Sequence, residues 1–128
     1  MASAIILFAH GARDPEWARP FHGILARLQQ ILPDTPVMVA YLECVQPTLA
    51  DAVTQLAEEG TTSITLIPMF LARGGHLKED LPKRLDLIRQ QHPELNFNIS
   101  PAIGEVDAIL QNLADWVYQE HQRNKKPA

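Results

Sequence analysis

The chain has 128 residues, of which 46% are hydrophobic, and its formal net charge at pH 7 is −4. This length and composition predict one domain, residues 1–128, with a sizeable hydrophobic core. The negative charge disfavours nucleic acid and anionic membranes as partners. Cys44 is the only cysteine, which excludes an intrachain disulfide, a cysteine-based zinc site and a four-cysteine cluster within one chain. A single thiol, together with the lack of a signal-peptide or membrane-spanning pattern, predicts a cytoplasmic protein.

Apolar runs alternate with segments of helical periodicity along the chain. Residues 4–9 form a short apolar run, which is typical of a strand buried on both faces. Asp14 and Pro15 are helix-start signals, and the regular helix is expected from Pro20. A second strand is predicted at residues 37–42, after a proline-rich breaker.

The middle of the chain repeats this alternation. Pro47 suits the start of the second helix, and Gly60 is a natural residue to end it. Residues 63–68 form the third predicted strand, followed by a glycine-bearing loop at residues 72–76. The third helix is expected from about residue 77 to residue 91.

The last two elements differ in character from the earlier ones. Residues 96–100 form a more polar strand, which is expected at an edge of the sheet. Glu105 or Asp107 starts the last helix. Its apolar stripe is expected to be buried and consists of Val106, Ile109, Leu110, Leu113 and Val117.

Strands that alternate with helices predict a parallel sheet with right-handed crossovers. The expected fold is therefore α/β and three-layered, with a four-stranded parallel sheet and helices on both faces. If the strand order is the flavodoxin-like 2-1-3-4, the first and third strands are neighbours at the switch point. The sequence does not itself show this order.

Two histidines follow two of these strands. His10 stands directly after the first strand, and His76 stands in the loop after the third. Ligands gather at the carboxyl ends of parallel strands, and two imidazoles there can hold a divalent transition metal. Singly, each histidine is more often a loop residue that only makes a hydrogen bond. Their joint placement beside glycines (Gly11, Gly74 and Gly75) favours a site, although these glycines can equally serve turns.

Further candidates flank the histidines. Glu43 follows the second strand. It can have a functional role, as a third metal ligand or a proton acceptor, or it can be an ordinary carboxylate at the entry of a helix, and the sequence favours neither. Basic side chains beside the two histidines, at the carboxyl edge of the sheet, suit a polyanionic substrate. Each of them taken alone is more often an ordinary solvated surface residue. An apolar run past the third strand suits a binding wall, a subunit contact or the core. The basic groups are Arg13, Arg73 and Lys78, and the apolar run is Met69, Phe70 and Leu71.

Three other classes of protein lack support in these residues. Histidine phosphatases need an arginine before the histidine, where this chain has Ala9. A phosphate-binding loop needs several glycines before the first helix, whereas residues 11–15 contain one. A response-regulator-like domain needs an acidic cluster after the first strand, where this chain has His10.

Three motifs resemble those of one known family, the sirohydrochlorin chelatases. The sequence LFAHGARDP at residues 7–15 resembles the opening of these enzymes. The sequences YLE at residues 41–43 and QPT at residues 46–48 are similar to their second-strand motif. The sequences PMFL at residues 68–71 and GGHLKEDLP at residues 74–82 resemble their third-strand motif, which is the most specific of the three. The resemblance spans essentially the whole chain.

The resemblance implies a short, class II chelatase with half the size of the two-domain enzymes. It implies that two chains pair as a homodimer around one tetrapyrrole cleft. It implies insertion of a divalent metal into sirohydrochlorin, with cobalt leading toward cobalamin and iron toward sirohaem. His10 and His76 match the metal-binding and catalytic histidines of the family, and Glu43 matches a recurrent acidic residue. The chain lacks the histidine-rich segment of some members, and its cysteines are too few for the iron–sulfur cluster of others.

This chemistry gives each candidate a role. Histidine ligands hold the metal without adding negative charge, and a neutral histidine or Glu43 can accept the pyrrole protons. Apolar residues are expected against the flat macrocycle, and basic residues against its peripheral carboxylates. The expected substrate-binding set is Arg13, Met69, Phe70, Leu71, Arg73, Gly74, Gly75, Leu77 and Lys78.

Two alternatives remain open from the sequence. The metal can be iron or nickel instead of cobalt, because imidazole and carboxylate ligands accept several ions. The same fold can also serve as a non-catalytic carrier of metal or tetrapyrrole, which would bind both without accelerating their union.

Overall fold

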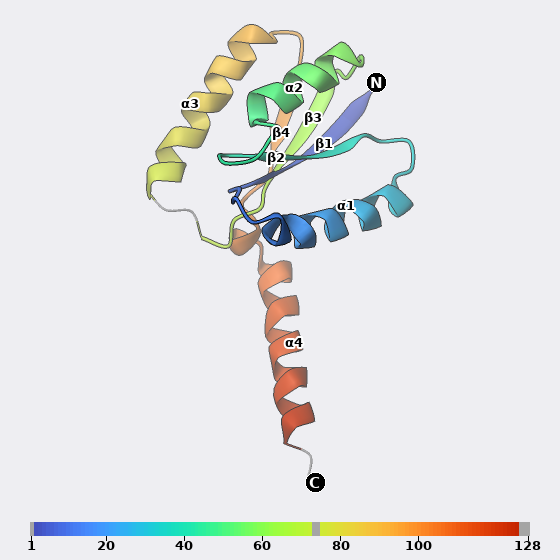
Figure 1. The fold of residues 1–128 in the computed structure, drawn as a ribbon, viewed down its shortest axis with the longest axis vertical. Coiled ribbons are helices and arrows are strands. Elements are labelled where there is room, and N and C mark those ends of the chain that lie inside the picture. Colours follow the sequence, from blue (N-terminus) through green and yellow to red (C-terminus); the bar gives the residue numbers. More distant parts are fainter. Residues whose placement is uncertain (1, 73–74, 126–128) are drawn as a thin grey trace.

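The computed structural model describes residues 2–72 and 75–125, without the side chains of residues 75–77. One four-stranded parallel sheet forms the centre of the molecule, and its strand order is β2-β1-β3-β4 (Figure 1). The strands are β1 (Ser3–Ala9), β2 (Val37–Tyr41), β3 (Ser63–Pro68) and β4 (Asn96–Ile99). The helices are α1 (Arg19–Ile31), α2 (Leu49–Glu58), α3 (Gly75–Gln91) and α4 (Asp107–Asn124), with 3₁₀ turns η1 (Pro15–Ala18) and η2 (Ile103–Glu105).

The expected strand order is therefore confirmed, with β1 and β3 as neighbours. Leu7 of β1 lies opposite Val39 of β2 and Ile67 of β3. Because all strands are parallel, β1, β2 and β3 end at the same edge of the sheet. The α/β fold class is confirmed as well, and β4 lies at an edge, as its polar sequence predicts.

One face of the sheet packs against α2 and α3 and forms the main core. Ile6, Phe8, Ile64 and Leu66 point to this face and are almost completely buried, and they pack with Leu56 of α2. Leu81, Leu85 and Ile88 of α3 close the same core, as their helical spacing predicts. This core holds the strands, and so the loops that follow them, in fixed positions.

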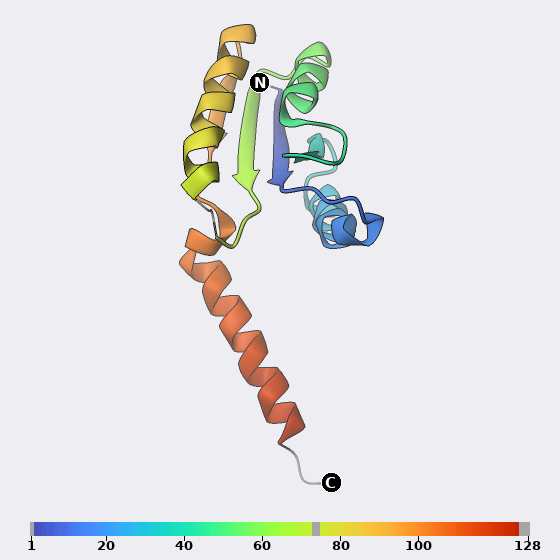
Figure 2. The same cartoon turned by 60° about the vertical axis from the view of Figure 1, so that its left-hand side comes forward.

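The other face is covered only in part. Helix α1 packs over β1 and β2 through Phe21, Ile24 and Leu28, together with Trp17 of η1. Helix α4 instead projects away from the body of the molecule, toward the C-terminus (Figures 1 and 2). Among the described residues, its only extended contact is with η2.

The prediction that the stripe of α4 is buried is therefore wrong within this chain. Leu110, Leu113 and Val117 are 43%, 44% and 58% exposed. Val106 and Ile109, next to η2, are half-buried. The helical period identifies an apolar side of a helix, but the direction in which α4 leaves η2 decides what that side contacts.

The position of η2 depends on Gly104. The Gly104 N–H donates to the carbonyl of Phe70 at 3.1 Å. A Cβ atom at this residue would lie 1.6 Å from the carbonyl oxygen of Leu71, so only glycine allows this approach. The root of α4 is thereby attached to the segment that follows β3.

Several helix boundaries follow local signals. Asp14 accepts a hydrogen bond from the Glu16 N–H at 3.0 Å, and α1 begins near Pro20, as predicted. Gly60 ends α2 with a φ of 93°, also as predicted. The predicted start of α2 at Pro47 is wrong, because Thr48 caps the helix by accepting from the Asp51 N–H.

The loop predicted at residues 72–76 is shorter than expected. Helix α3 begins at Gly75, so the backbone of His76 lies in its first turn. Pro82 then falls inside the helix, where it lacks the N–H that would bond to the Lys78 carbonyl. A glycine pair favours a loop by propensity, but a first helical turn needs no internal N–H donors and tolerates it.

The loops after β1 and β2 are joined by backbone hydrogen bonds. The Leu42 N–H donates to the Ala9 carbonyl at 2.9 Å, and the Glu43 N–H donates to the His10 carbonyl at 3.0 Å. Gly11 has a φ of 95°, and a Cβ atom there would lie 1.9 Å from the Glu43 carbonyl oxygen. The two loops can approach this closely only because residue 11 is a glycine.

We expect Leu56→Ala to lower the free energy of unfolding by about 2–5 kcal/mol, because it leaves a cavity in a packed core. Leu56 is 0% exposed, whereas Leu87 on α3 is 61% exposed. The matched control Leu87→Ala removes the same atoms from the surface and should change stability by less than about 0.5 kcal/mol. Urea unfolding measures both values, and equal losses would contradict the assignment of the core.

We expect Gly11→Ala to be much more destabilising than Gly60→Ala. Both glycines have nearly the same backbone conformation, with φ of 95° and 93°, so alanine meets the same strain of about 1–2 kcal/mol at each. Only at Gly11 does the new Cβ also collide with the backbone, whereas nothing lies within 4 Å at Gly60. Urea unfolding of both variants gives the two losses of unfolding free energy, and the excess loss at Gly11 measures the cost of the collision with the Glu43 carbonyl. Equal losses would contradict the close approach of the two loops at Gly11.

Candidate functional site

His10 and Glu43 form a hydrogen-bonded pair at the carboxyl edge of the sheet. His10 follows the last residue of β1, and Glu43 lies two residues past the end of β2. The distance between His10 Nε2 and Glu43 Oε1 is 2.8 Å. The structure thus brings together two of the three predicted catalytic residues.

The pair is open to solvent. The side chains of His10 and Glu43 are 54% and 58% exposed. An exposed pair of this kind contributes little to stability, about 0–1 kcal/mol. Both groups can therefore be reached by a ligand and can exchange partners at little cost to the fold.

The contact with Glu43 uses Nε2 of His10 and leaves Nδ1 as the other ring nitrogen. A neutral imidazole carries one N–H, so an Nε2–H that donates to Glu43 leaves Nδ1 with a free lone pair. That lone pair can bind a metal ion or accept a proton. This contact has the form of the carboxylate–histidine pairs found at metal sites.

A tight turn at Cys44 holds Glu43 in place. The Val45 N–H donates back to the Glu43 carbonyl at 2.9 Å, and Cys44 between them has a φ of 69°. This is a γ-turn with a positive φ at its centre, a rare and strained conformation. The chain then returns to the sheet, where the Tyr41 N–H donates to the Pro47 carbonyl at 3.0 Å. Sequence reasoning missed this turn, because cysteine carries no signal for a positive φ.

A cleft of about 390 Å³ lies beside the pair, between the loop after β1 and the turn after β2. Arg13 lines it from one side and Cys44 from the other, with Tyr41 at its base. Burial raises the pKa of the Tyr41 hydroxyl, so this group stays neutral. Arg13 is exposed and forms no ion pair with a carboxylate of the described chain, so its charge is available to an anion.

The three apolar residues after β3 point in different directions. Met69 is half-buried against residues on the α1 side of the sheet. Phe70 is buried in the main core, where its ring meets Phe8 edge to face at 5.8 Å. Only Leu71 is well exposed, at 64%. Of this run, Leu71 is the residue that presents an apolar surface at the carboxyl edge.

Part of the predicted site lies outside the described residues. This applies to Arg73 and Gly74, and to the side chains of His76 and Leu77. Gly75 begins α3, and Lys78 is exposed on its first turns. Among the side chains that the structure describes, no group of three histidine, cysteine or acidic residues has a metal-binding arrangement. His10 and Glu43 supply two donors, which leaves the rest of a metal's coordination open.

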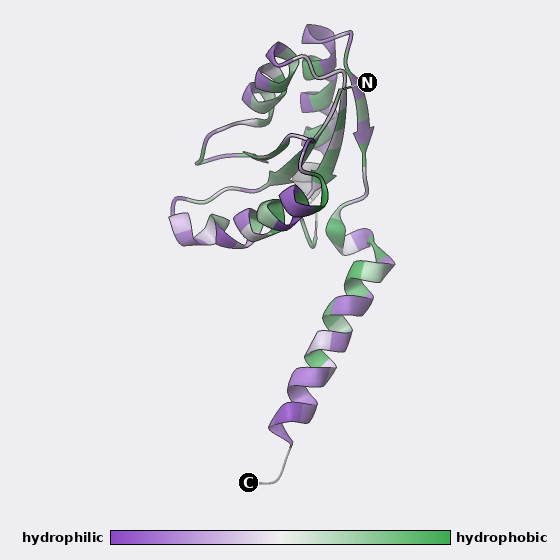
Figure 3. Ribbon diagram, turned by 90° about the vertical axis from the view of Figure 1, so that its right-hand side faces the viewer, coloured by the Kyte–Doolittle hydropathy of each residue, from purple (hydrophilic) through white to green (hydrophobic). Residues whose placement is uncertain are grey.

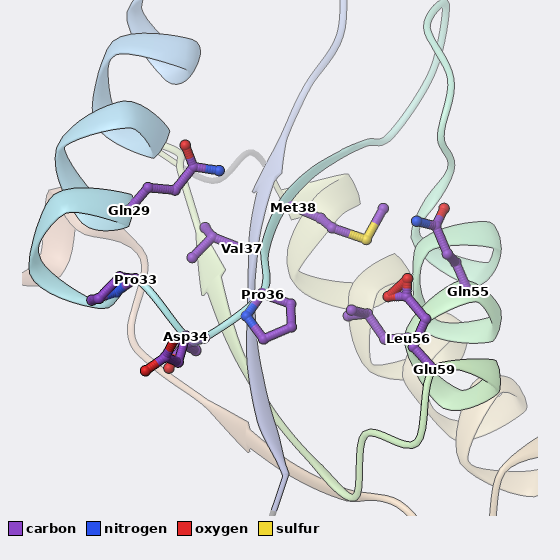
Figure 4. Close-up of a pocket in the computed structure, with 10 residues that line it drawn as sticks. Gln29, Pro33, Asp34, Pro36, Val37, Met38, Gln55, Leu56 and Glu59 are labelled. Carbon is purple, nitrogen blue, oxygen red and sulfur yellow. The ribbon is translucent and has the colours of Figure 1, made fainter.

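A second cleft is unrelated to this pair. It has a volume of about 480 Å³ and lies where β2 begins, between the chain around Asp34 and the end of α2 (Figure 4). Val37 and Met38 at the start of β2 line it, together with Glu59. His10 stands at the opposite end of the strands, so this cleft is not part of the candidate site.

Relatives with known names match most of the chain. It is 36% identical over 84 residues to the sirohydrochlorin cobaltochelatase of Methanopyrus kandleri, across 66% of this chain and 59% of that protein. It is 26% identical to the sirohydrochlorin ferrochelatase of Priestia megaterium, across 89% of this chain and 43% of that protein. This chain thus spans about half the length of these two relatives. With the sirohydrochlorin cobaltochelatase of Saccharolobus solfataricus, identity is 26% across 94% of this chain and 97% of the relative.

Solved structures share the fold. A putative cobalamin biosynthesis CbiX protein from Marinobacter aquaeolei VT8 has a TM-score of 0.82 at 27% identity, over 94% of this chain and 98% of that one. SirB from Bacillus subtilis, solved with Fe³⁺, has a TM-score of 0.79 at 22% identity, over 99% of this chain and 49% of that one.

No helix among the described residues is long and apolar enough to cross a membrane. The CbiX family model matches residues 4–120, and the chain therefore belongs to the CbiX family.

Proposed function

We propose that this chain inserts a divalent metal ion into sirohydrochlorin. The observation that carries the proposal is the solvent-open pair of His10 and Glu43 at the carboxyl edge of the sheet. Membership of the CbiX family supports it, as do relatives named sirohydrochlorin cobaltochelatase and ferrochelatase. Cobalt is the proposed metal, because cobaltochelatase is the more frequent name among these relatives. Iron and nickel are the alternatives to be tested.

The reaction has a simple balance of atoms. Two pyrrole N–H bonds break, two protons leave to bases, and the macrocycle nitrogens bind the ion as it loses its water ligands. His10 Nδ1 holds the incoming ion without adding negative charge, so the ion is not trapped. Glu43, 2.8 Å from the same ring, accepts a pyrrole proton directly, because the ion then occupies the free nitrogen of His10. His76 is proposed as the second imidazole of this site.

Recognition of the macrocycle follows from its shape and charge. Arg13, Arg73 and Lys78 are proposed to pair with its peripheral carboxylates, and the exposed side chain of Leu71 to contact its flat face. Met69 and Leu77 are proposed to extend that apolar surface, and Phe70 supports it from the core. Gly74 and Gly75 allow the backbone to approach the ring closely.

The wider assignment of the chain is also a proposal. Residues 1–128 correspond to one half of a two-domain chelatase, since the chain covers 49% and 51% of two SirB structures. Two such chains then pair as a homodimer to complete one cleft. The free thiol of Cys44 is exposed, which suits the reducing cytoplasm as the place of the reaction.

The direct test mixes the purified protein with sirohydrochlorin and Co²⁺, Fe²⁺ or Ni²⁺ and follows the absorbance change. We expect the protein to accelerate insertion, most strongly for Co²⁺. His10→Ala should lower the rate by about 100-fold or more, and Glu43→Gln by about 10²- to 10⁴-fold, the range for a lost proton acceptor. His92→Gln and Glu59→Gln are matched controls at the amino end of the sheet and should retain the rate.

Two results would reject this function. A rate equal to that of the uncatalysed mixture for every metal would show that the protein is not a chelatase. If it still binds Co²⁺ or sirohydrochlorin, the remaining function is that of a non-catalytic carrier. Full activity in both His10→Ala and Glu43→Gln would remove the pair from the site.

A separate prediction concerns Arg13. Because this exposed guanidinium has no carboxylate partner among the described residues, Arg13→Gln should raise KM for sirohydrochlorin several-fold with little change in kcat. The effect should shrink as salt screens the charge. Arg27→Gln on α1, which removes a cation that bonds only to the Gly23 carbonyl, is the control. A fall in kcat at unchanged KM would show that Arg13 does not act through substrate binding.

A further inference from the structure

Four polar side chains line one cleft beside the candidate site and have no partner in the described part of the chain. The cleft is the one of about 390 Å³ between the loop after β1 and the turn after β2, here called the Tyr41 cleft. None of the four side chains forms a hydrogen bond or an ion pair with another described residue. They are those of Arg13, His22 of α1, Tyr41 of β2 and Gln46.

Tyr41 is the most informative of the four, because it is buried. The residue is 4% exposed and lies at the base of the cleft. Buried tyrosine hydroxyls normally have a hydrogen-bond partner, since a buried polar group without one is costly. Within residues 2–72 and 75–125, the Tyr41 hydroxyl has none. It therefore calls for an acceptor that enters the cleft from outside the chain.

The fold holds the ring of Tyr41 in place. Tyr41 pairs with Ala9 of β1 in the sheet, and its N–H donates to the Pro47 carbonyl at 3.0 Å. Its ring packs against the ring of Trp17, with 6.3 Å between the centroids. The hydroxyl is thus positioned before a ligand arrives, which lowers the entropy cost of binding.

The four side chains can all donate hydrogen bonds. The Arg13 guanidinium is a cation that only donates, and a tyrosine hydroxyl, an imidazole and an amide each carry a donor. Asp14 also lines the cleft, but its carboxylate already accepts from the Glu16 N–H at 3.0 Å as the cap of η1. A cation beside a fixed hydroxyl suits an anion, and the planar fork of a guanidinium matches a carboxylate.

We propose that the Tyr41 cleft binds one peripheral carboxylate of the tetrapyrrole, with the Tyr41 hydroxyl and the Arg13 guanidinium as its main donors. His22 and Gln46 are further donors to the same carboxylate. A volume of about 390 Å³ holds such an arm together with several waters, since one water takes about 30 Å³. The inference rests on the proposed function, and it adds Tyr41, His22 and Gln46 as residues that determine specificity.

The place of the cleft favours the macrocycle over a free carboxylate. Arg13 comes three residues after His10, and Tyr41 comes two residues before Glu43. Both segments therefore lead from the cleft directly to the pair of His10 and Glu43. A flat ring whose nitrogens face a metal ion at this pair extends its rim over the adjoining loops, where a carboxylate arm meets the cleft. An arm held there also sets the orientation of the ring at the pair.

The first test separates a role in binding from a role in folding. Tyr41→Phe removes only the hydroxyl oxygen and keeps the packed ring. Because that hydroxyl has no partner among the described residues, its loss should leave the urea midpoint unchanged or raise it. A clear fall in the midpoint would show that the hydroxyl is bonded within the folded chain, and would overturn the inference.

The second test uses sodium propionate as the probe and NMR of the ¹⁵N-labelled protein as the readout. We expect propionate to shift the amide signals of residues 11–13 and 44–46, and the uncharged propionamide to leave them in place. Tyr41→Phe and Arg13→Gln should each raise the dissociation constant of propionate by about 10-fold or more, the effect of losing a hydrogen bond to a charged group.

The matched control for the hydroxyl is Tyr118→Phe. Tyr118 is 62% exposed and lies on α4, the helix that projects from the body of the molecule (Figure 3). This variant should bind propionate as the wild type does. Equal weakening in Tyr41→Phe and Tyr118→Phe, or a wild-type protein whose signals propionate does not shift, would overturn the inference.

The third test connects the cleft to the macrocycle through the chelation assay. Tyr41→Phe should raise KM for sirohydrochlorin by about 10-fold with little change in kcat, the same loss of a hydrogen bond to a charged group. His22→Leu should raise KM several-fold, whereas His22→Gln, which keeps an N–H donor, should not. Propionate should compete with sirohydrochlorin in the wild type and much less in Tyr41→Phe.

The results distinguish failure of the cleft from failure of the reaction. Propionate binding that depends on the Tyr41 hydroxyl supports the cleft even if the protein does not accelerate insertion. An unchanged KM in Tyr41→Phe, or propionate that binds without competing with sirohydrochlorin, would overturn the inference and leave the proposed reaction intact.

Discussion

The backbone hydrogen bond from Glu43 to the His10 carbonyl is the constraint on which the candidate site depends. It continues the pairing of β1 with β2 beyond the last residues of both strands, and it requires glycine at position 11. The bond between the two side chains cannot set this geometry, because both are more than half exposed and such a pair is weak. The backbone therefore positions the imidazole and the carboxylate, and both remain free to exchange a proton or a metal ion with a substrate.

The two faces of the sheet are covered to different extents. Helices α2 and α3 bury one face, with Phe8, Leu56 and Leu66 fully enclosed. On the other face, α1 covers the β1–β2 half, and the surface over β3 stays open. The apolar cleft over β1 and β3 and the apolar side of α4 both remain exposed within this chain.

Local sequence patterns predict much of this fold, for physical reasons. Apolar runs identify β1, β2 and β3, because buried strand positions exclude polar residues, whereas β4 is a more polar strand at an edge of the sheet. The Asp14 cap and Gly60 act within a few residues, so their effect can be inferred without the tertiary structure. The predicted starts of α2 and α3 are wrong for local reasons. Pro47 has the propensity to begin a helix, but the side chain of Thr48 caps α2. The glycine pair has the propensity to form a loop, but the first turn of α3 tolerates it.

Features that depend on contacts between distant segments were not predictable from local sequence. The order of the strands was assumed by analogy, and the exposure of α4 was not foreseen, because periodicity does not say which molecule covers an apolar stripe. The sequence placed His10 and Glu43 at one edge but not within 2.8 Å of each other. That distance depends on the close approach at Gly11 and on the positive φ of Cys44, which residue type does not reveal.

The contact of η2 with the segment after β3 links the root of α4 to the carboxyl edge of the sheet, where the candidate site lies. Gly104 bonds to the Phe70 carbonyl and lies against the Leu71 carbonyl, and α4 starts three residues later. Leu71 in turn precedes the segment that leads into the first turn of α3, where the backbone of His76 lies. The root of α4 is therefore attached to the backbone that precedes the first turn of α3 in the chain. Because Gly104 admits no side chain at this contact, the root of α4 lies directly against the backbone of Phe70 and Leu71.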